Sequence, residues 1–345
     1  MKKNKKQLAI ITAGIILVTI TLVITVTHAL KSSAKSGENN TKLQPDTPET
    51  EEILNFLIVG HDKASNLTDV MMLASFNVTE KTVNILQIPR DTYASYTEYG
   101  YRKINGACYA LGGMKELCSF LSATMAVPID YYVSLELDAF SEIVDAIGGV
   151  EINIPHALDY EDPAQGLSIH LPAGTQTLDG KSAEQFIRFR SGYLCGDLGR
   201  IDAQKLFMTA LVKKFQSSFS AGTVASLVFA VINDISTDIP VNKIIKLARA
   251  ALKVEMSDIK FITLPGSDAR ALRSGAWYYV LSRESSSEII KRYLAGDTGT
   301  EFDPECVFLN PDYSEFEKIY YGDYGYEIYS ADDISENGIS IKTTD

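Results

Sequence analysis

A long uncharged segment near the N-terminus sets the first limit on what this chain can fold into. Residues 7–30 contain no Asp, Glu, Lys or Arg, and residues 10–26 are almost wholly Ile, Leu, Val, Thr and Ala. A helix of about 20 such residues spans the hydrocarbon core of a bilayer. Basic residues flanking such a helix stay on the cytoplasmic side. Four precede it: Lys2, Lys3, Lys5 and Lys6. Residues 1–30 are therefore predicted to form a membrane anchor with a cytoplasmic N-terminus.

The competing interpretation is a cleaved signal peptide. The only candidate cleavage site, residues 27–29, is a poor match to the small-residue sites of such peptides, and the apolar segment is long for one. We therefore favour an uncleaved anchor, which leaves the rest of the chain outside the cell. Residues 31–52 are rich in Ser, Asn, Thr, Pro and Glu, so they are predicted to be a disordered tether.

Residues 53–295 alternate between short apolar stretches and helical patterns, which favours an α/β or α+β domain. Strands are predicted at residues 56–59, 70–76, 83–88, 131–137, 150–154, 259–264 and 276–281. Helices are predicted at residues 113–125, 139–147, 182–186, 200–215, 221–233, 241–252 and 286–294. We expect a turn-rich connection at 171–180, and a peripheral appendage in the acidic, Tyr-rich residues 296–345.

Arginines dominate the most informative stretch, residues 188–204. Arg188 and Arg190 alternate with apolar residues, which on extended backbone would place both guanidiniums on one face. Arg200 and Gln204 are four residues apart at the start of a helical pattern, so they share a helix face. A cluster of guanidiniums needs an anion, and its forked donors suit phosphate. A set of solvated surface salt bridges is an equally weighted alternative.

Carboxylates occur where predicted strands end. Asp62 follows the first strand, Asp69 precedes the second, and Arg90 and Asp91 follow the third. Charged residues at such positions in open sheets commonly form a site, although turn or cap chemistry also explains Asp62 and Asp69. The sequence lacks phosphate-loop, dinucleotide-binding, zinc-protease and nucleophile-elbow motifs. Carboxylates with arginines are the parts that metal-assisted phosphoryl transfer needs.

Charge and cysteine content exclude other classes. The net charge of −12 argues against general nucleic-acid binding, which favours a basic face. No Cys-x-x-Cys pair occurs, so a zinc site is disfavoured. The four cysteines permit disulfides in an oxidising compartment, and pairing of Cys108 with Cys118 or two buried free thiols are both open. The others are Cys195 and Cys306.

Taken in order, the motifs resemble the LytR-CpsA-Psr family of bacterial envelope proteins. The resemblance is dense over residues 53–215 and continues weakly to residue 294. The matching residues are Gly60-x-Asp62, Asp69 before Met71-Met72-Leu73, Ile88-Pro89-Arg90-Asp91-Thr92, Lys103-Ile104-Asn105-Gly106-Ala107, Ile129-Asp130-Tyr131-Tyr132, Val144-Asp145-Ala146-Ile147-Gly148-Gly149-Val150, Leu178-Asp179-Gly180, Arg188-x-Arg190, and Asp197 with Arg200 and Gln204.

The resemblance implies an α/β/α sandwich with a central mixed sheet, held outside the cell membrane by one transmembrane helix. It implies a Mg²⁺-dependent phosphotransferase that moves an anionic glycopolymer, such as wall teichoic acid or capsular polysaccharide, from its polyprenyl-pyrophosphate carrier. The acceptor is the primary hydroxyl of N-acetylmuramic acid in peptidoglycan, and the product is a phosphodiester. The expected partners are therefore the lipid-linked polymer, peptidoglycan and membrane lipid, and no nucleic acid is expected.

The same resemblance assigns roles to individual residues. Asp62 and Asp69 are expected to hold magnesium or the attacking hydroxyl, and carboxylate oxygens suit this hard cation. The expected catalytic set is Asp62, Asp69, Arg90 and Asp91. The expected pyrophosphate contacts are Arg90, Arg188, Arg190, Arg200 and Gln204.

Two positions depart from the family pattern, which usually has arginines where this chain has Leu67 and Ala203. This leaves a second hypothesis open, a catalytically weak scaffold that binds a polyprenyl pyrophosphate. A third, a membrane-bound transcriptional attenuator, is opposed by the anchor topology and the acidic charge.

The predicted topology can be tested on intact protoplasts. Added protease should digest the domain after residue 52, because the anchor places it outside the cell. Complete protection of that domain would show that the orientation is wrong.

Overall fold

The computed structural model describes residues 53–62, 66–96, 102–162, 167–190, 192–193, 197–218, 235–240, 243, 247, 250–251, 253–294, 312–317 and 328–339. The predicted anchor, the tether and the predicted helix at 221–233 lie outside these residues. Within them, no helix has the length and apolar character needed to cross a membrane.

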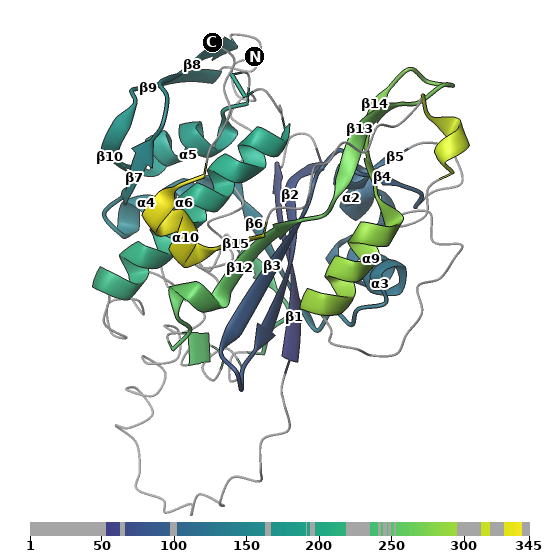
Figure 1. Ribbon diagram of the computed structural model, residues 1–345, viewed down its shortest axis with the longest axis horizontal. Coiled ribbons are helices and arrows are strands. Elements are labelled where there is room, and N and C mark those ends of the chain that lie inside the picture. The colour runs from purple at the N-terminus through teal and green to yellow at the C-terminus, as the bar shows by residue number, and fades with distance from the viewer. Residues whose placement is uncertain are drawn as a thin grey trace, which may run out of the picture.

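A mixed seven-stranded sheet forms the centre of the described protein (Figure 1). Its order is β11-β6-β1-β2-β3-β12-β15. Strands β1 to β3 form an antiparallel meander, whereas β6 joins β1 and β12 joins β3 in parallel. The bounds are β1 Ile53–Asp62, β2 Leu67–Asn77, β3 Thr82–Ile88, β6 Tyr131–Glu136, β11 Ile235–Thr237, β12 Ile259–Thr263 and β15 Ile328–Ser330. The expectation of a mixed α/β fold with a central mixed sheet is confirmed.

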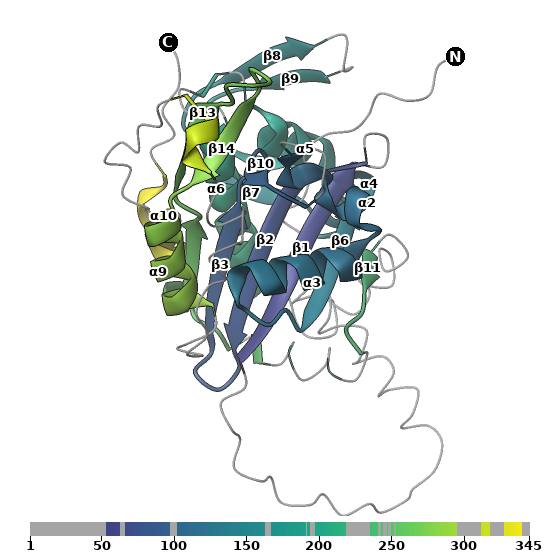
Figure 2. The same ribbon diagram turned by 90° about the vertical axis from the view of Figure 1, so that its right-hand side faces the viewer.

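Both faces of this sheet are buried. Along β1, Phe56 and Ile58 point into one apolar core and Leu57 and Val59 into another, because successive strand residues face opposite sides. Helices cover both faces (Figure 2). The first core is covered by α4 (Leu137–Ala146), α5 (Gly180–Arg188) and α6 (Asp197–Ser218). The second is covered by α2 (Ala107–Leu111), α3 (Met114–Met125) and α9 (Arg283–Tyr293).

Two-stranded ladders flank the central sheet. They pair β4 (Tyr93–Ala94) with β5 (Arg102–Lys103), β7 (Val150–Ile154) with β10 (Gly174–Leu178), β8 (Leu158–Asp162) with β9 (Leu167–Leu171), and β13 (Gly266–Arg270) with β14 (Trp277–Leu281). The expected turn-rich connection at 171–180 is therefore wrong in its centre, where β10 pairs with β7. Its local composition favours turns, but pairing with a distant strand overrides that preference.

Helix α5, which ends in the arginine stretch, is fixed tightly against α4. Asp145 Oδ1 accepts a hydrogen bond from Gly180 N at 2.7 Å, and a Cβ at Gly180 would collide with the backbone oxygen of Ser141. Asp179 caps the helix by accepting from Ser182 N at 2.8 Å. Only glycine permits this close approach of the two helices, which sets where α5 ends.

The described part of residues 296–345 is integral to the fold, so the expectation of a peripheral appendage is wrong for it. Strand β15 pairs with β12 at the edge of the sheet, and α10 (Ala331–Asn337) packs beside α6. Ala331 and Ile334 are buried in the first core. Lys205 Nζ of α6 lies 5.2 Å from the ring centroid of Tyr329. This segment therefore supports the helix that carries the site.

The described cysteines are unpaired. Cys108 and Cys118 are both free and partly buried. Of the two alternatives left open by the sequence, the structure therefore has two free thiols and no disulfide between them. Burial raises the pKa of the Cys118 thiol to about 12, which keeps it protonated and unreactive. Cys195 and Cys306 lie outside the described residues.

The packing of α10 gives a stability prediction. Ile334→Ala should lower the free energy of unfolding by about 2–5 kcal/mol, because it leaves a cavity in the first core. Chemical denaturation of the full chain measures this. Glu336→Ala, an exposed change in the same helix, should stay within roughly 0.5 kcal/mol. Equal stability of the two variants would mean that α10 does not contribute to the core.

Candidate active site

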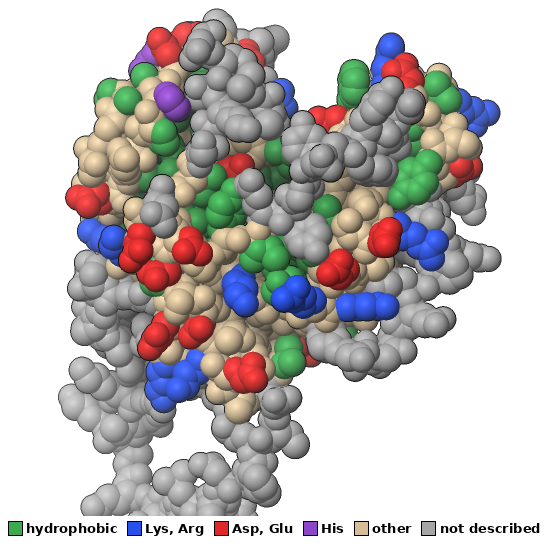
Figure 3. All heavy atoms as spheres, in the orientation of Figure 1, with side chains coloured by type: hydrophobic (Ala, Val, Ile, Leu, Met, Phe, Trp, Pro, Cys, Tyr) green, Lys and Arg blue, Asp and Glu red, His purple; other side chains and the backbone are tan. Residues whose placement is uncertain are grey.

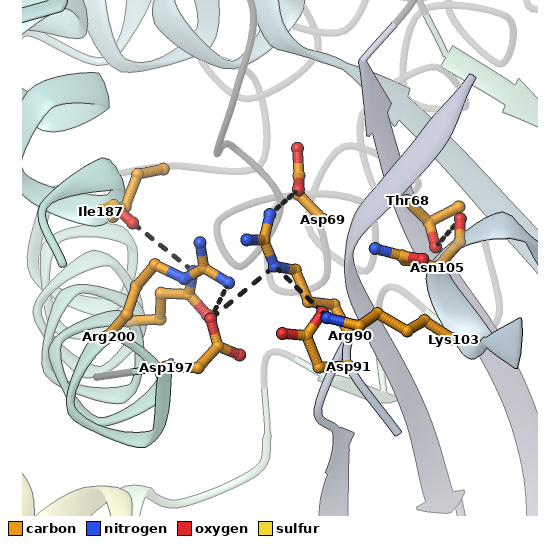
Figure 4. A network of polar contacts seen from close by, with 10 residues as sticks. Thr68, Asp69, Arg90, Asp91, Lys103, Asn105, Ile187, Asp197 and Arg200 are labelled. Carbon is orange, nitrogen blue, oxygen red and sulfur yellow. Dashed lines mark hydrogen bonds and ion pairs between the residues drawn. The ribbon is translucent and has the colours of Figure 1, made fainter. Parts of the chain in front are cut away.

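Polar side chains from three parts of the fold meet at one end of the central sheet (Figure 4). Asp69 lies near the start of β2, and Arg90 and Asp91 follow β3. Because β2 is antiparallel to β1 and β3, its start lies beside the ends of those strands. The structure therefore brings together these three residues, which the sequence had placed separately at strand ends.

The segment after β3 is held in a tight turn. Both the backbone nitrogen and Oγ1 of Thr92 donate to the oxygen of Pro89, at 3.0 and 2.6 Å. Asn105 N donates to the oxygen of Arg90 at 3.2 Å, and Asn105 O accepts from Thr68 Oγ1 at 3.1 Å. Through Asn105, these bonds join the Arg90 segment to Thr68 in β2. They therefore fix the direction in which the Arg90 side chain leaves the backbone.

Arg90 is the centre of the polar network. Its Nη1 donates to Asp69 Oδ1 at 2.7 Å, and its Nε lies 3.9 Å from Asp91 Oδ1 and 3.8 Å from Asp197 Oδ1. The Asp69 side chain is only 2% exposed, so these charges meet away from bulk water. Burial lowers the pKa of Arg90, but the carboxylates, led by Asp69, outweigh it and the pKa is raised overall. One guanidinium thus joins β2, the end of β3 and α6.

Helix α6 supplies the opposite wall. Asp197 lies in its first turn and accepts a hydrogen bond from Arg200 Nη2. A carboxylate is favourable there because the helix dipole places positive charge at the N-terminus. One turn later, Gln204 Nε2 donates to the backbone oxygen of Ile187 at 3.5 Å. In this structure Gln204 therefore holds α6 to the end of α5.

Arg188 is the last residue of helix α5. We expected extended backbone with Arg188 and Arg190 on one face, but α5 continues through Arg188, so that expectation is wrong. Glu184 lies one turn earlier and its Oε1 is 2.9 Å from Arg188 Nη1, a pairing that favours helix. The Arg188 side chain is 6% exposed, whereas Arg190 is exposed.

Several buried guanidinium nitrogens have no hydrogen-bond acceptor among the described residues: Arg90 Nε, Arg188 Nε and Nη2, and Arg200 Nε. A buried donor left without an acceptor costs about 1–3 kcal/mol, and more when it is charged. Burial lowers the pKa of Arg200, and the nearby charges of Arg90 and Arg190 act in the same direction against the attraction of Asp197. These nitrogens are donors for which the described residues supply no acceptor.

The structure adds three residues to this site, of which the sequence motifs contained Lys103 and Asp197 without a role and did not contain Asp268. Lys103 Nζ lies 3.0 Å from Asp91 Oδ1, and Asp197 bridges Arg90 and Arg200. The Asp-x-x-Arg spacing at a helix start was a signal for Asp197. Asp268 lies opposite Tyr279 in the β13–β14 ladder, and Tyr279 N donates to the backbone oxygen of Asp91 at 2.9 Å, so Asp268 is one strand away from the site. No local signal marked Asp268, because it arrives through the packing of β13.

Some expected site residues are not placed by the structure. Asp62 is the last residue of β1, but its side chain lies outside the described part, as do Lys63 and residues 194–196. Of the two departures from the family pattern, Leu67 shares a face of β2 with Asp69 because they are two residues apart. Ala203 is fully buried in the first core, so its side chain packs against apolar neighbours and does not face a ligand.

The described residues include no group of three or more His, Cys, Asp or Glu side chains that could hold a metal ion. Magnesium usually needs fewer protein ligands, since one or two carboxylates and substrate phosphates complete its shell. Asp197 Oδ2 is buried and has no hydrogen-bond partner among the described residues. Asp69 and Asp197 are the described carboxylates whose oxygens fit a magnesium ion at this site.

The fold and the site together define a mixed α/β protein with a buried guanidinium cluster suited to a phosphate-bearing ligand. The chain belongs to the LytR-CpsA-Psr family, whose sequence model matches residues 19–294. The resemblance seen in the sequence motifs is confirmed.

Individual relatives agree with this assignment. The chain is 29% identical over 261 residues to the polyisoprenyl-teichoic acid–peptidoglycan teichoic acid transferase TagU of Bacillus mycoides (strain KBAB4), covering 75% of this chain and 82% of that protein. The crystal structure of B. subtilis TagV matches the fold with a TM-score of 0.61 at 22% identity, over 71% of this chain and 98% of that chain. The structure of TagT bound to LIIa-WTA matches with a TM-score of 0.57 at 25% identity, over 73% and 93%.

The unsatisfied guanidinium nitrogens give a binding prediction. Arg188→Ala should weaken binding of farnesyl pyrophosphate about ten- to a hundredfold, because a hydrogen bond to a charged group contributes about 1.5–3 kcal/mol. Calorimetric titration of the full chain measures this. Arg190→Ala should weaken binding by a factor nearer ten, because that side chain is exposed.

Lys181→Ala is the matched control, since it removes an exposed positive charge from the same helix. It should leave the affinity unchanged. If Arg188→Ala and Lys181→Ala bind equally well, the cluster is a structural salt-bridge set and not a phosphate site.

Proposed function

We propose that this protein transfers an anionic glycopolymer, a teichoic acid or a similar cell-wall polysaccharide, from a polyprenyl-pyrophosphate carrier to peptidoglycan. Membership of the LytR-CpsA-Psr family supports this, as do the activity for which its TagU relative is named and the ligand of the TagT structure. The single observation that carries the proposal is the set of buried guanidinium nitrogens without acceptors. A diphosphate offers several oxygens to such a set at once.

The proposed reaction is a phosphoryl transfer. The acceptor hydroxyl attacks the phosphorus that bears the glycopolymer, a new P–O bond forms, and the bond to the bridging oxygen breaks. The hydroxyl proton goes to a carboxylate, with Asp69 as the best described candidate and Asp62 as the other expected one. Polyprenyl phosphate leaves with the bridging oxygen. No covalent enzyme intermediate is needed.

The arginines stabilise the charge that develops during this step. Arg188 and Arg200 are buried and the Arg90 side chain is only 13% exposed, so their attraction for phosphate oxygens is screened less than at a surface. They are held in place before the substrate binds, by Asp69, Glu184 and Asp197, and therefore need little reorganisation at the moment of reaction. Arg190 and Gln204 stay proposed pyrophosphate contacts, Arg190 from the exposed side.

Magnesium is part of the proposal as an aid to charge neutralisation. When bound between the diphosphate and one or two carboxylates, it would withdraw charge from the phosphate oxygens. The residues proposed to hold it are Asp62 and Asp69, with Asp197 as an addition from the geometry. Leu67 removes an arginine that the family usually has, so the metal would carry more of the charge here.

The cellular setting is also proposed. A lipid-linked donor requires the catalytic domain to work at a membrane surface, which agrees with the anchor predicted at residues 1–30. We propose a single-pass protein of the cell membrane, with the domain outside and with membrane lipid as a neighbour. A scaffold that binds the lipid pyrophosphate without turnover is the second candidate, and the departures at Leu67 and Ala203 favour it.

A transfer assay separates the two candidates. The full chain in detergent, given a lipid-linked polymer and peptidoglycan fragments, should form a polymer–peptidoglycan phosphodiester and release polyprenyl phosphate, both visible by mass spectrometry. Asp69→Asn should reduce transfer by at least about a hundredfold, as loss of a catalytic proton acceptor does. Chelation of magnesium should also stop it, and added Mg²⁺ should restore it.

Donor binding is the control in this assay. A wild-type chain that binds the donor but forms no phosphodiester would establish the scaffold. A reaction that continues at full rate in the presence of chelator would remove magnesium from the mechanism while leaving the transfer in place.

A further inference from the structure

The β13–β14 hairpin carries an unusual exposed aromatic residue. Trp277 is the only tryptophan in the chain, and it is 59% exposed. Figure 3 shows apolar and basic side chains together on the surface of the lobe formed by this hairpin, at the upper right. Nothing in the proposed phosphate chemistry uses this residue.

The two faces of the hairpin differ sharply. Ala269 and Tyr278 lie on one face and are buried against Tyr93 and Phe316. Asp268, Arg270 and Trp277 lie on the other face and are all exposed. Their alignment follows from the register, in which Arg270 is opposite Trp277 and Asp268 is opposite Tyr279, because cross-strand partners share a face. Apolar packing therefore buries one face. On the other face, Asp268, Arg270 and Trp277 form a row of three exposed side chains next to Tyr279, which is buried in the second core.

This row begins at the candidate active site. Tyr279 N donates to the backbone oxygen of Asp91 at 2.9 Å, and Tyr279 also forms a parallel bridge with Thr92. Asp268 is therefore one strand away from the catalytic segment, and Trp277 is two residues further out along β14.

We propose that the exposed face of the β13–β14 hairpin, formed by Asp268, Arg270 and Trp277, is a subsite that binds the sugar rings of the peptidoglycan acceptor. The inference rests on the proposed function and adds to it the place where the second substrate docks. The guanidinium cluster on α5 and α6 takes the donor diphosphate on one side of Arg90. The hairpin receives the acceptor strand on the other side, next to Asp91.

The chemistry of the row fits a glycan. A pyranose ring has an apolar face that packs against an indole, and hydroxyls at its edge that bind carboxylates and guanidiniums. A membrane contact fits less well. Asp268 lies in the row, and Arg270 Nη1 is 3.6 Å from Glu317 Oε1, so carboxylates border the tryptophan. Surfaces that enter a lipid interface combine apolar residues with unpaired basic ones.

The single tryptophan makes binding directly measurable. In the full chain purified in detergent, titration with soluble GlcNAc–MurNAc glycan strands should change the Trp277 emission in a saturable way, with no donor present. Asp268→Asn should weaken this response. Because no transfer is needed, this result is independent of the proposed reaction: saturable binding without turnover would support the subsite while the proposed function failed.

The kinetic test uses matched aromatic changes. Trp277→Ala should raise the KM for the glycan acceptor at least roughly tenfold, as for buried aromatic anchors of interfaces, and leave the KM for the lipid-linked donor unchanged. Trp277→Phe should recover most of the loss. Tyr109→Ala removes an aromatic ring that is 71% exposed on α2 and should change neither constant.

Two results would overturn the subsite. One is an unchanged acceptor KM in Trp277→Ala together with no glycan-dependent emission change in the parent chain. The other is quenching of Trp277 by brominated lipids after reconstitution into vesicles, with no response to glycan, which would assign the hairpin to the membrane surface.

Discussion

A buried guanidinium must find acceptors, and in this protein that requirement joins the sheet to helix α6. Arg90 leaves the end of β3 and reaches Asp69 in β2 and Asp197 at the start of α6. Arg200 shares Asp197 from the other side. The network is held away from bulk water, so its geometry depends on exact packing of the elements that carry it. Some guanidinium nitrogens of Arg90, Arg188 and Arg200 have no hydrogen-bond acceptor among the described residues, and an anion is proposed to supply one.

The supports of this network extend far along the chain. Glycine at position 180 lets α5 pack directly on α4, and Gln204 joins the end of α5 to α6. Strand β15 and helix α10, from the last part of the chain, complete the sheet edge and pack beside α6. A helix that carries charged residues into a core needs such support, because a shift of about 1 Å would separate pairs that only direct contact stabilises.

The site has two sides with different chemistry. On the α5–α6 side, buried arginines prevail, and they suit the diphosphate of the proposed donor. On the other side, Asp91 is paired with Lys103. The backbone oxygen of Asp91 also accepts a hydrogen bond from Tyr279 N of the β13–β14 hairpin, whose exposed face carries polar side chains. A transfer between two large polymers requires that both approach one phosphorus without competing for the same contacts. The proposed separation of a phosphate side from a sugar side would provide this.

The sequence by itself determined the fold class, most strands and helices, the family, and the residue types of the site. These follow from local periodicity and from motifs at strand ends, which the chain displays without reference to its partners. The sequence predicted Asp69, Arg90, Asp91 and Arg200 as site residues, and the structure brings them into one network of polar contacts.

Only the tertiary structure decided which of these side chains are buried, paired or left without acceptors. It turned the expected extended arginine segment into the end of α5, because Glu184 and the contact with α6 favour helix there. It made a strand of residues 174–178, because β7 offers a partner, and it built β15 into the central sheet. It also brought Asp268 towards Asp91 through the pairing of distant strands. Contacts between residues far apart in the chain have no local signal in the sequence. The burial of a side chain depends on all of these contacts together, and burial sets how strongly its charge interacts with its neighbours.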